Sequence, residues 1–222
     1  VLGALPARFE RVLYMFSGDG VYFDQVAPDV RVVVSTARSW PGRLRALAAH
    51  IRRERPDVVM PFLSYFVTYL ATRLAGTGAR VVFNQGTPTT GFLDDPDFQW
   101  RGGWRRRVFE AMTRLLYPRA DAVVVTSAGV GDDLADRYGV PRARLRVLHN
   151  PVDVEAVGRL AAEPIDAALA PGSTPTLVAA GRLAGVKNFP LLLDALSRLP
   201  DRRARLWILG DGDERSALEA RT

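Results

Sequence analysis

Short apolar runs alternate with segments of helical periodicity along the whole chain. The strand-like runs are mostly continuous rather than alternating, and they span residues 12–16, 30–35, 57–61, 80–84, 122–126, 145–149, 176–180 and 206–210. Continuous Val, Leu and Ile runs are typical of parallel strands that are buried on both faces. The pattern therefore predicts an α/β protein.

Helical segments lie between these runs, at residues 41–55, 65–75, 104–117, 129–138 and 189–199, and a further helix is expected to begin at Glu214. The helix at 104–117 carries apolar residues at 104, 108, 109, 112, 115 and 116, which predicts one buried stripe. Repeated β-α-β order predicts stacked parallel sheets with helices on both sides.

The composition of the sequence changes near Asn150, where an Ala-, Pro- and Gly-rich stretch begins and continues to Pro175. We expect a Rossmann-like domain at 1–150, a linker with a short helix at 151–173, and a second domain from 174 to 222. Two strands and two helices are too few to bury a core alone. The second domain is therefore expected to be incomplete. The chain, which does not begin with Met, is interpreted as a fragment truncated at both ends and of little activity by itself.

Composition excludes several classes of site. The chain has no cysteine, which excludes disulfides and thiolate metal sites, and its two histidines argue against a His-rich metal centre. No apolar run approaches the roughly 18 residues that span a bilayer, so we expect a cytoplasmic protein. The net charge of +6 favours an anionic partner.

Lys187 stands out because it is the chain's one lysine among thirty basic residues. It lies in a loop between an apolar strand and an apolar helix, which is the usual anion site of an open α/β sheet. Lysine is a compact point charge, whereas arginine is a planar fork, so the two bind phosphate differently. The alternative is a solvated loop cation.

Four segments together resemble the retaining glycosyltransferases of family 4, which have the GT-B fold. They are Ala122-Val-Val-Val-Thr-Ser127 with the helix after it, the crossover ending in Asn150-Pro-Val-Asp153, the loop Gly181-Arg182-Leu183-x3-Lys187-Asn188-Phe189, and the strand ending in Gly210-Asp211-Gly212. The resemblance is clear over 121–222 and vaguer over 1–120. The family's Glu-x7-Glu motif and its first glycine-rich loop are not found in this sequence.

The resemblance implies two Rossmann-like parallel-sheet domains and a retaining transfer of a sugar. The donor would be a UDP- or GDP-linked sugar, and the acceptor a hydroxyl on a glycan, a lipid-linked glycan or a small molecule. No cofactor and no metal would be needed. Arg182 and Lys187 would bind the diphosphate and act as the catalytic cations. The donor-binding residues would also include Gly181, Asn188, Gly210 and Gly212.

This assignment agrees with the chemistry of the leaving group. Negative charge develops on the β-phosphate, and without a metal it must be neutralised by fixed cations and backbone N–H groups. Glycines let the backbone approach a phosphate closely. Asn188 is suited to cap the following helix, and Pro190 to its first turn. The alternative for 210–212 is an ordinary tight turn, with Asp213 capping the last helix.

Candidates on the acceptor side are Gln85, Gly86 and Thr87, which follow a strand of the first domain, and Ser127, which follows another. Gln85 and Thr87 could contact sugar hydroxyls. The alternatives are a strand-end turn at 84–91 and a helix N-cap at Ser127. The acidic residues at 94–97 are interpreted as solvated rather than as a general base.

Trp104, followed by three arginines, opens an amphipathic helix. Basic residues beside tryptophan favour docking at an anionic bilayer, so peripheral contact with the inner membrane face is one interpretation. The other is a surface helix with Trp104 packed inward.

Two other functions are alternatives to a transferase. A GT-B sugar-nucleotide epimerase is disfavoured by the Gly-Arg-Leu-x3-Lys-Asn loop. A nucleic-acid-binding domain would need basic residues on one face, whereas arginine is spread over nearly every predicted helix. We therefore expect no nucleic-acid partner.

Overall fold

The computed structural model describes residues 5–18, 23, 26–94, 103–165, 174–200 and 203–221. The chain divides into two compact units, one of residues 1–90 and 103–151 and the other of residues 91–102 and 152–222. All strand pairs in the described residues are parallel. The predicted α/β architecture with parallel sheets is confirmed.

The first unit contains a pair of strands and a four-stranded sheet. The pair is β1 (Val12–Met15) and β2 (Arg31–Val34), and the sheet has the order β3 (Val58–Val59), β4 (Arg80–Gln85), β5 (Ala122–Val125) and β6 (Leu145–Val147). In the register, Phe83 is opposite Val123 and Gln85 is opposite Val125. The ends of β4 and β5 therefore lie side by side at the carboxyl edge of the sheet.

The helices of this region are α1 (Trp40–Glu54), α2 (Tyr65–Ala75), α3 (Thr89–Asp94), α4 (Trp104–Leu116) and α5 (Ala128–Tyr138). The Ser39 side chain accepts a hydrogen bond from Gly42 N at 3.2 Å, and Pro41 lies in the first turn, so α1 starts where the sequence predicts. Gly76 and Gly139 end α2 and α5 in the left-handed conformation. The short helix α3 was not predicted.

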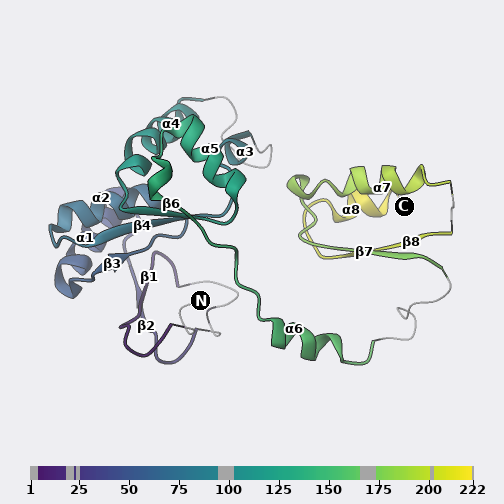
Figure 1. Cartoon of the computed structure of the whole chain (residues 1–222), viewed down its shortest axis with the longest axis horizontal. Helices are drawn as coiled ribbons and strands as arrows, with labels where there is room; N and C mark the ends of the chain where they lie inside the picture. Colours follow the sequence, from purple (N-terminus) through teal and green to yellow (C-terminus); the bar gives the residue numbers. More distant parts are fainter. Residues whose placement is uncertain are drawn as a thin grey trace. The chain divides into compact units, whose positions relative to one another are not determined.

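Aromatic rings fill the centre of the first unit. Phe83 of β4 is fully buried, and its ring centroid lies 4.6 Å from that of Tyr117 and 5.6 Å from that of Tyr65. Helices α4 and α5 lie over the same face of the sheet (Figure 1), and Leu134 of α5 belongs to this cluster. After the exposed Arg80, residues of β4 and β5 alternate between buried and half-buried, so the expected burial on both faces is only partly met.

The face of helix α4 that is buried differs from the apolar stripe predicted from the sequence. Trp104 is 71% exposed, and Val108 and Leu115 are also exposed, whereas Leu116 is buried. Phe109 packs on Phe66 of α2, with ring centroids 5.0 Å apart. The expectation that Trp104 packs inward is wrong, because the contact with α2 turns the other side of the helix toward the core.

The second unit contains α6 (Val154–Ala161), β7 (Thr176–Ala180), α7 (Phe189–Ser197), β8 (Arg205–Leu209) and α8 (Arg215–Glu219). Helices α7 and α8 lie over one face of the β7–β8 pair (Figure 1) and enclose Leu183, Phe189 and Leu218. Among the described residues no helix covers the other face, where Val178 and Leu209 are exposed. Helices on both sides were expected, and for this pair that expectation is not met.

Helix α6 forms in the segment that was expected to be a linker with a short helix. The Asp153 side chain accepts a hydrogen bond from Ala156 N at 2.8 Å and so caps the helix. None of its residues is buried. Within the described parts of the chain, no helix is long and apolar enough to cross a membrane.

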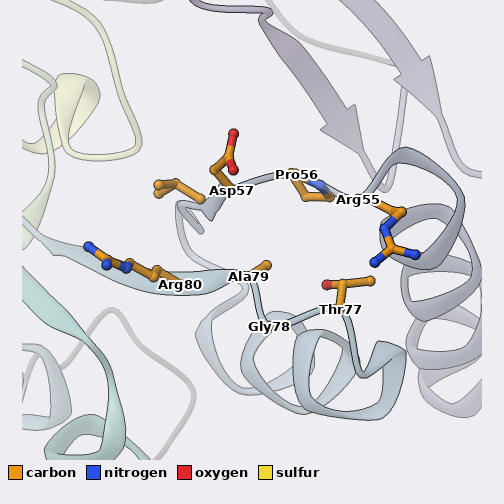
Figure 2. Close-up of a pocket in the computed structure, with 8 residues that line it drawn as sticks. Arg55, Pro56, Asp57, Thr77, Gly78, Ala79 and Arg80 are labelled. Carbon is orange, nitrogen blue, oxygen red and sulfur yellow. The ribbon is translucent and has the colours of Figure 1, made fainter.

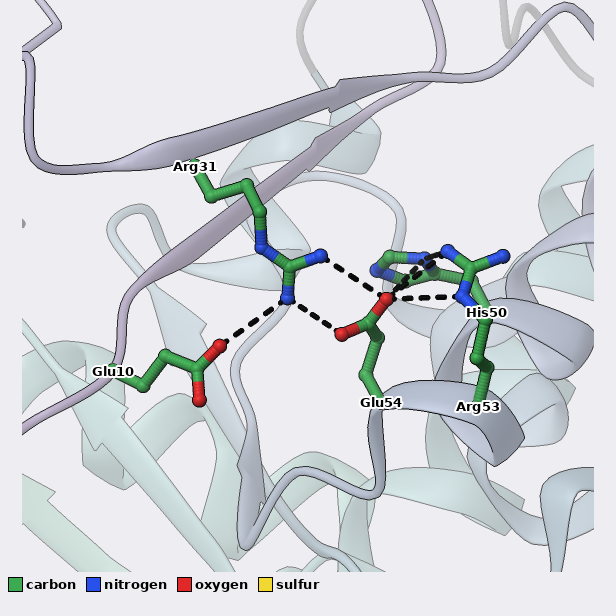
Figure 3. A network of polar contacts seen from close by, with 5 residues as sticks. All are labelled: Glu10, Arg31, His50, Arg53 and Glu54. Atoms are coloured by element: carbon green, nitrogen blue, oxygen red, sulfur yellow. Dashed lines mark hydrogen bonds and ion pairs between the residues drawn. The ribbon is translucent and has the colours of Figure 1, made fainter.

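An ion-pair network ties β2 to the end of α1 (Figure 3). Arg31 donates to both carboxylate oxygens of Glu54, at 3.1 and 2.5 Å, and Arg53 donates to the same carboxylate at 3.1 Å. His50 is buried against the ring of Tyr14, and its Nδ1 accepts from Arg53 at 3.0 Å. The network therefore holds a neutral imidazole.

This network predicts two acid-induced losses of stability. Burial, with Arg53 and Arg31 nearby, lowers the pKa of His50 below 6.5 despite the opposing Glu54 carboxylate. Hydrogen bonds from Arg31 and then Arg53 lower the pKa of Glu54 from 4.5 to about 2. Because the pKa of each group is lower in the folded state, each contributes stability above its unfolded pKa and loses that contribution on acidification. The loss runs from pH 6.5 downward for His50 and from pH 4.5 toward 2 for Glu54.

Thermal melts across this pH range test the assignment. The melting temperature should fall in two steps, and His50→Gln should remove the step that begins near pH 6.5. His149→Gln is the control, because it removes the other imidazole and should leave the His50 step in place. An unchanged first step in His50→Gln would contradict the assignment.

Candidate functional site

The loop after β7 carries the two predicted diphosphate cations. Arg182 and Lys187 are exposed, and neither has an ion-pair partner among the described residues. A Cβ built on Gly181 would lie 3.8 Å from both Cδ and Cε of Lys187, so the lysine stem passes over this glycine. The structure thus places Gly181 and Lys187 together at the carboxyl end of β7.

Backbone hydrogen bonds fix the course of this loop. Lys187 N donates to Ala184 O at 2.8 Å, and Asn188 N donates to Gly185 O at 3.0 Å, which forms a 3₁₀ turn over Gly185–Lys187. Asn188 then adopts a left-handed conformation, with φ of 51°, and its side chain makes no capping hydrogen bond. The predicted capping by the Asn188 side chain is therefore wrong, while Pro190 does lie in the first turn of α7.

The two glycines after β8 pack directly on the β7 loop. Leu183 N donates to Asp211 O at 2.9 Å, and Glu214 N donates to Leu183 O at 3.1 Å. A Cβ on Gly210 would lie 1.9 Å from the carbonyl oxygen of Gly181, and one on Gly212 would lie 2.4 Å from that of Leu183. Both positions need glycine for this backbone contact, a role that was not predicted from the sequence.

The acidic residues after β8 lie in the turn that leads to α8. One Asp211 carboxylate oxygen accepts from Gly212 N at 2.9 Å and lies 3.7 Å from Arg215. Helix α8 follows Glu214 without a side-chain cap, so the suggested Asp213 cap is wrong. Glu214 is a residue that sequence reasoning missed. Its Oε2 is buried and has no hydrogen-bond partner within the described residues, and only the fold could show this.

On the first unit, Gln85 is held inside the protein rather than presented to a ligand. It is 9% exposed, its Oε1 accepts from Tyr117 at 2.8 Å, and its Nε2 donates to Thr87 O at 2.8 Å. The proposed contact of Gln85 with a sugar hydroxyl is therefore not supported by its position. Gly86 and Thr87 are exposed beside it.

Thr126 at the end of β5 joins this loop to the crossover strand. Its hydroxyl donates to Gly86 O at 2.9 Å, its N–H donates to Gln85 O at 3.3 Å, and its carbonyl lies 2.9 Å from His149 Nδ1. Ser127 is the N-cap of α5, and its hydroxyl accepts from Val130 N at 3.4 Å. Of the two interpretations of Ser127, the structure supports the cap.

Two threonines that follow the loop were not predicted as site residues. Thr89 is 2% exposed, and its hydroxyl has no hydrogen-bond partner within the described residues. Thr90 donates from both its N–H and its hydroxyl to the carboxylate of Asp133, at 3.2 and 2.5 Å. The two hydrogen bonds between Thr90 and Asp133 fix the start of α3 against α5.

A polar cavity of about 460 Å³ lies elsewhere, at the amino ends of β3 and β4. Its lining includes Arg55, Asp57, Thr77 and Arg80, and Figure 2 shows the two arginines on opposite sides of it. Ligands of open α/β sheets bind at the carboxyl edge. The candidate residues at 84–87, which end β4, are therefore at the other edge of the sheet. Among the described residues, no group of three or more His, Asp or Glu side chains could hold a metal ion.

Ligands of open α/β sheets bind at the carboxyl ends of the strands, where the loops after β4, β5 and β7 lie. Residues 2–156 match the sequence profile of Glycosyltransferase Family 4. The match covers more than half of the chain, and the chain belongs to this family.

Curated relatives agree with the family. The chain is 31% identical over 144 residues to N-acetylgalactosamine-N,N'-diacetylbacillosaminyl-diphospho-undecaprenol 4-alpha-N-acetylgalactosaminyltransferase of Campylobacter jejuni, covering 64% of this chain and 36% of that protein. It is 34% identical over 113 residues to the lipopolysaccharide core biosynthesis glycosyltransferase LpsE of Rhizobium meliloti, covering 50% of this chain and 31% of that protein. The matched part thus spans about a third of these relatives.

A solved structure supports the fold. Anabaena Alr3699/HepE in complex with UDP superposes with a TM-score of 0.66 at 16% identity, covering 94% of this chain and 56% of that one. At this identity the likeness concerns the fold, which is of the GT-B type with Rossmann-like sheets.

Proposed function

We propose that the protein transfers a sugar from a nucleoside diphosphate sugar to an acceptor hydroxyl. The observation that carries the proposal is the pair of exposed cations Arg182 and Lys187, which have no carboxylate partner among the described residues, on a strand-end loop. The charge that develops on the β-phosphate of the leaving group needs such fixed cations. Residues 174–222 would supply the donor side, and residues 1–150 the acceptor side.

The proposal includes retention of configuration without a metal or other cofactor. The exposed part of the loop after β4 offers the hydroxyl of Thr87 and the backbone of Gly86 rather than a carboxylate. A mechanism on the front face of the donor, in which the leaving phosphate helps to deprotonate the acceptor, needs no protein base there. Gly86 and Thr87 would then orient the acceptor.

The name of one relative and the ligand of the fold neighbour support a choice of substrates. HepE was crystallised with UDP, and the Campylobacter relative acts on a diphospho-undecaprenol acceptor. We extend the proposal to a UDP- or GDP-linked donor and to a lipid-linked glycan acceptor, met in the cytoplasm at the inner face of the membrane. An epimerase or a nucleic-acid-binding role gains no support from these relatives.

Nucleotide binding tests the proposal. UDP or GDP should raise the melting temperature of the chain in a concentration-dependent way, because a ligand that binds only the folded state stabilises it by about 2.7 kcal/mol at 100 times its Kd. Uridine and guanosine, which lack the diphosphate, should have no effect at the same concentrations. Failure of both diphosphates to stabilise the folded chain would overturn the assignment of the donor site.

A further inference from the structure

Three neighbouring strands of the first unit end beside one another at the carboxyl edge of the sheet. Gly86 follows β4, Thr126 follows β5, and His149 lies two residues after β6. Leu148 N donates to Val125 O at 2.9 Å, so the pairing of β5 with β6 continues past the end of β6. His149 therefore lies at the edge where ligands of open α/β sheets bind.

Thr126 connects His149 to the loop after β4. Its hydroxyl donates to Gly86 O at 2.9 Å, and its N–H donates to Gln85 O at 3.3 Å. Its carbonyl oxygen lies 2.9 Å from His149 Nδ1. One half-buried threonine thus holds the imidazole of His149 within two hydrogen bonds of the exposed Gly86.

The contact with Thr126 determines which nitrogen of His149 carries the hydrogen. A carbonyl oxygen only accepts, so Nδ1 must donate, and Nε2 of the neutral ring is then an acceptor. His149 is exposed, and its Nε2 has no hydrogen-bond partner among the described residues. The ring therefore presents one free acceptor, and the hydrogen bond of Nδ1 fixes its orientation.

The hydrogen-bonding groups at this edge indicate the chemistry of a ligand. Nε2 of His149 accepts, and the hydroxyl of the exposed Thr87 both donates and accepts. A sugar hydroxyl also does both and can pair with either group. An ionised phosphate oxygen only accepts and would face the lone pair of Nε2. No group of three or more His, Asp or Glu side chains in the described parts of the chain could hold a metal ion.

We propose that Nε2 of His149 accepts a hydrogen bond from a hydroxyl of the sugar acceptor, and that Thr126 is the positioning residue that fixes the ring. The inference rests on the proposed transfer reaction, because it adds a residue to the acceptor side of the same site. His149 binds and orients the acceptor. The proton of the reacting hydroxyl still goes to the leaving phosphate.

Imidazole NMR tests the proposal on the whole 222-residue chain, which has only two histidines. Above neutral pH, the ¹⁵N shifts of His149 should show the hydrogen on Nδ1. The probes are the methyl glycosides of glucose, galactose and N-acetylgalactosamine, and at least one should shift the Nε2 resonance of His149 in a saturable way. The resonances of His50 should not move, because that ring is buried against Tyr14. A hydrogen on Nε2, or no shift with any probe, would overturn the proposal.

Two variants separate sugar binding from a structural role of His149. His149→Asn can place an amide N–H near the position of Nδ1 and keep the contact with Thr126, but it has no group at the position of Nε2. His149→Gln can place an amide oxygen near the position of Nε2, but it loses the contact with Thr126. Affinity is read from the amide resonances of Gly86 and Thr87.

The two variants should differ in their affinity for the glycoside. His149→Asn should lower the affinity roughly 10-fold, which corresponds to about 1.4 kcal/mol, and His149→Gln should keep part of it. Wild-type affinity in His149→Asn, with a loss only in His149→Gln, would leave His149 a structural role alone and overturn the proposal.

Arg146→Gln is the matched control on the same strand. Arg146 is exposed, and its guanidinium donates to Ala143 O at 2.7 Å, near the start of β6. This variant should bind the glycosides as the wild type does. A loss equal to that of His149→Asn would show that the effect is not specific to the imidazole and would count against the proposal.

The melts with UDP and GDP keep this inference distinct from the transfer reaction. Stabilisation by a diphosphate, with no effect of the glycosides on His149, would refute the role of His149 and leave the donor site standing. Glycoside binding at His149 without stabilisation by either diphosphate would support the sugar site and contradict the transfer reaction. A shift of Nε2 with UDP but with no glycoside would assign His149 to the donor and overturn the proposal.

Discussion

Replacement of Gly210 by alanine is expected to unfold the second unit while the first unit stays folded. The new Cβ would lie 1.9 Å from the carbonyl oxygen of Gly181, and the backbone φ of 153° at Gly210 is one that residues with a Cβ rarely adopt. The opposing atom is backbone, so no side chain can rotate away. Overpacking costs typically 1–3 kcal/mol, and a strained backbone adds about as much. A sheet of two strands has little stability to lose.

Hydrogen exchange resolves the two units separately. In Gly210→Ala, the amides of β7 and β8 should lose protection, whereas those of β4 and β5 should keep it. Gly181→Ala is the matched control, because its Cβ would meet only side-chain atoms at 3.7 Å or more. If Gly210→Ala keeps wild-type protection in β8, the two loops do not pack as described.

Removal of the two loop cations is expected to abolish binding of nucleoside diphosphates. A hydrogen bond to a charged group contributes about 1.5–3 kcal/mol, so Arg182→Ala and Lys187→Ala should each weaken UDP or GDP binding roughly 10- to 100-fold. The double variant should lose the thermal stabilisation altogether. Both side chains are exposed, so the melting temperature without ligand should not change.

Two further variants make this result specific. Arg198→Ala removes an exposed arginine at the other end of α7 and should bind diphosphates normally. Lys187→Arg keeps the charge but replaces a point charge by a planar fork, so it should restore only part of the affinity. A double variant that binds UDP with wild-type affinity would place the diphosphate elsewhere.

The order of strands and helices could be predicted because each element carries its own pattern. Runs such as 176–180 became β7 with the same ends, and Pro and Gly marked several helix boundaries. The face that α4 buries could not be predicted. Trp104, Val108 and Phe109 are equally apolar in the sequence, and only the contact of Phe109 with Phe66 decides which of them is covered.

The loops of the candidate site could be predicted from the sequence, but the roles of individual side chains could not. Arg182 and Lys187 lie exposed in the loop after a strand, as expected. The inward placement of Gln85 could not be predicted, because its partner Tyr117 is 32 residues away in sequence. The buried oxygen of Glu214 and the buried hydroxyl of Thr89 could not be found without the fold, because their lack of partners depends on distant segments.

The close approach of the loops 181–183 and 210–212 also limits how the sequence can change over time. Any side chain gained at 210 or 212 needs a displaced backbone at 181 or 183, so single steps through the intermediate sequences are unfavourable. We therefore expect a side chain at 210 or 212 to be tolerated only together with a change in the backbone at 181–183.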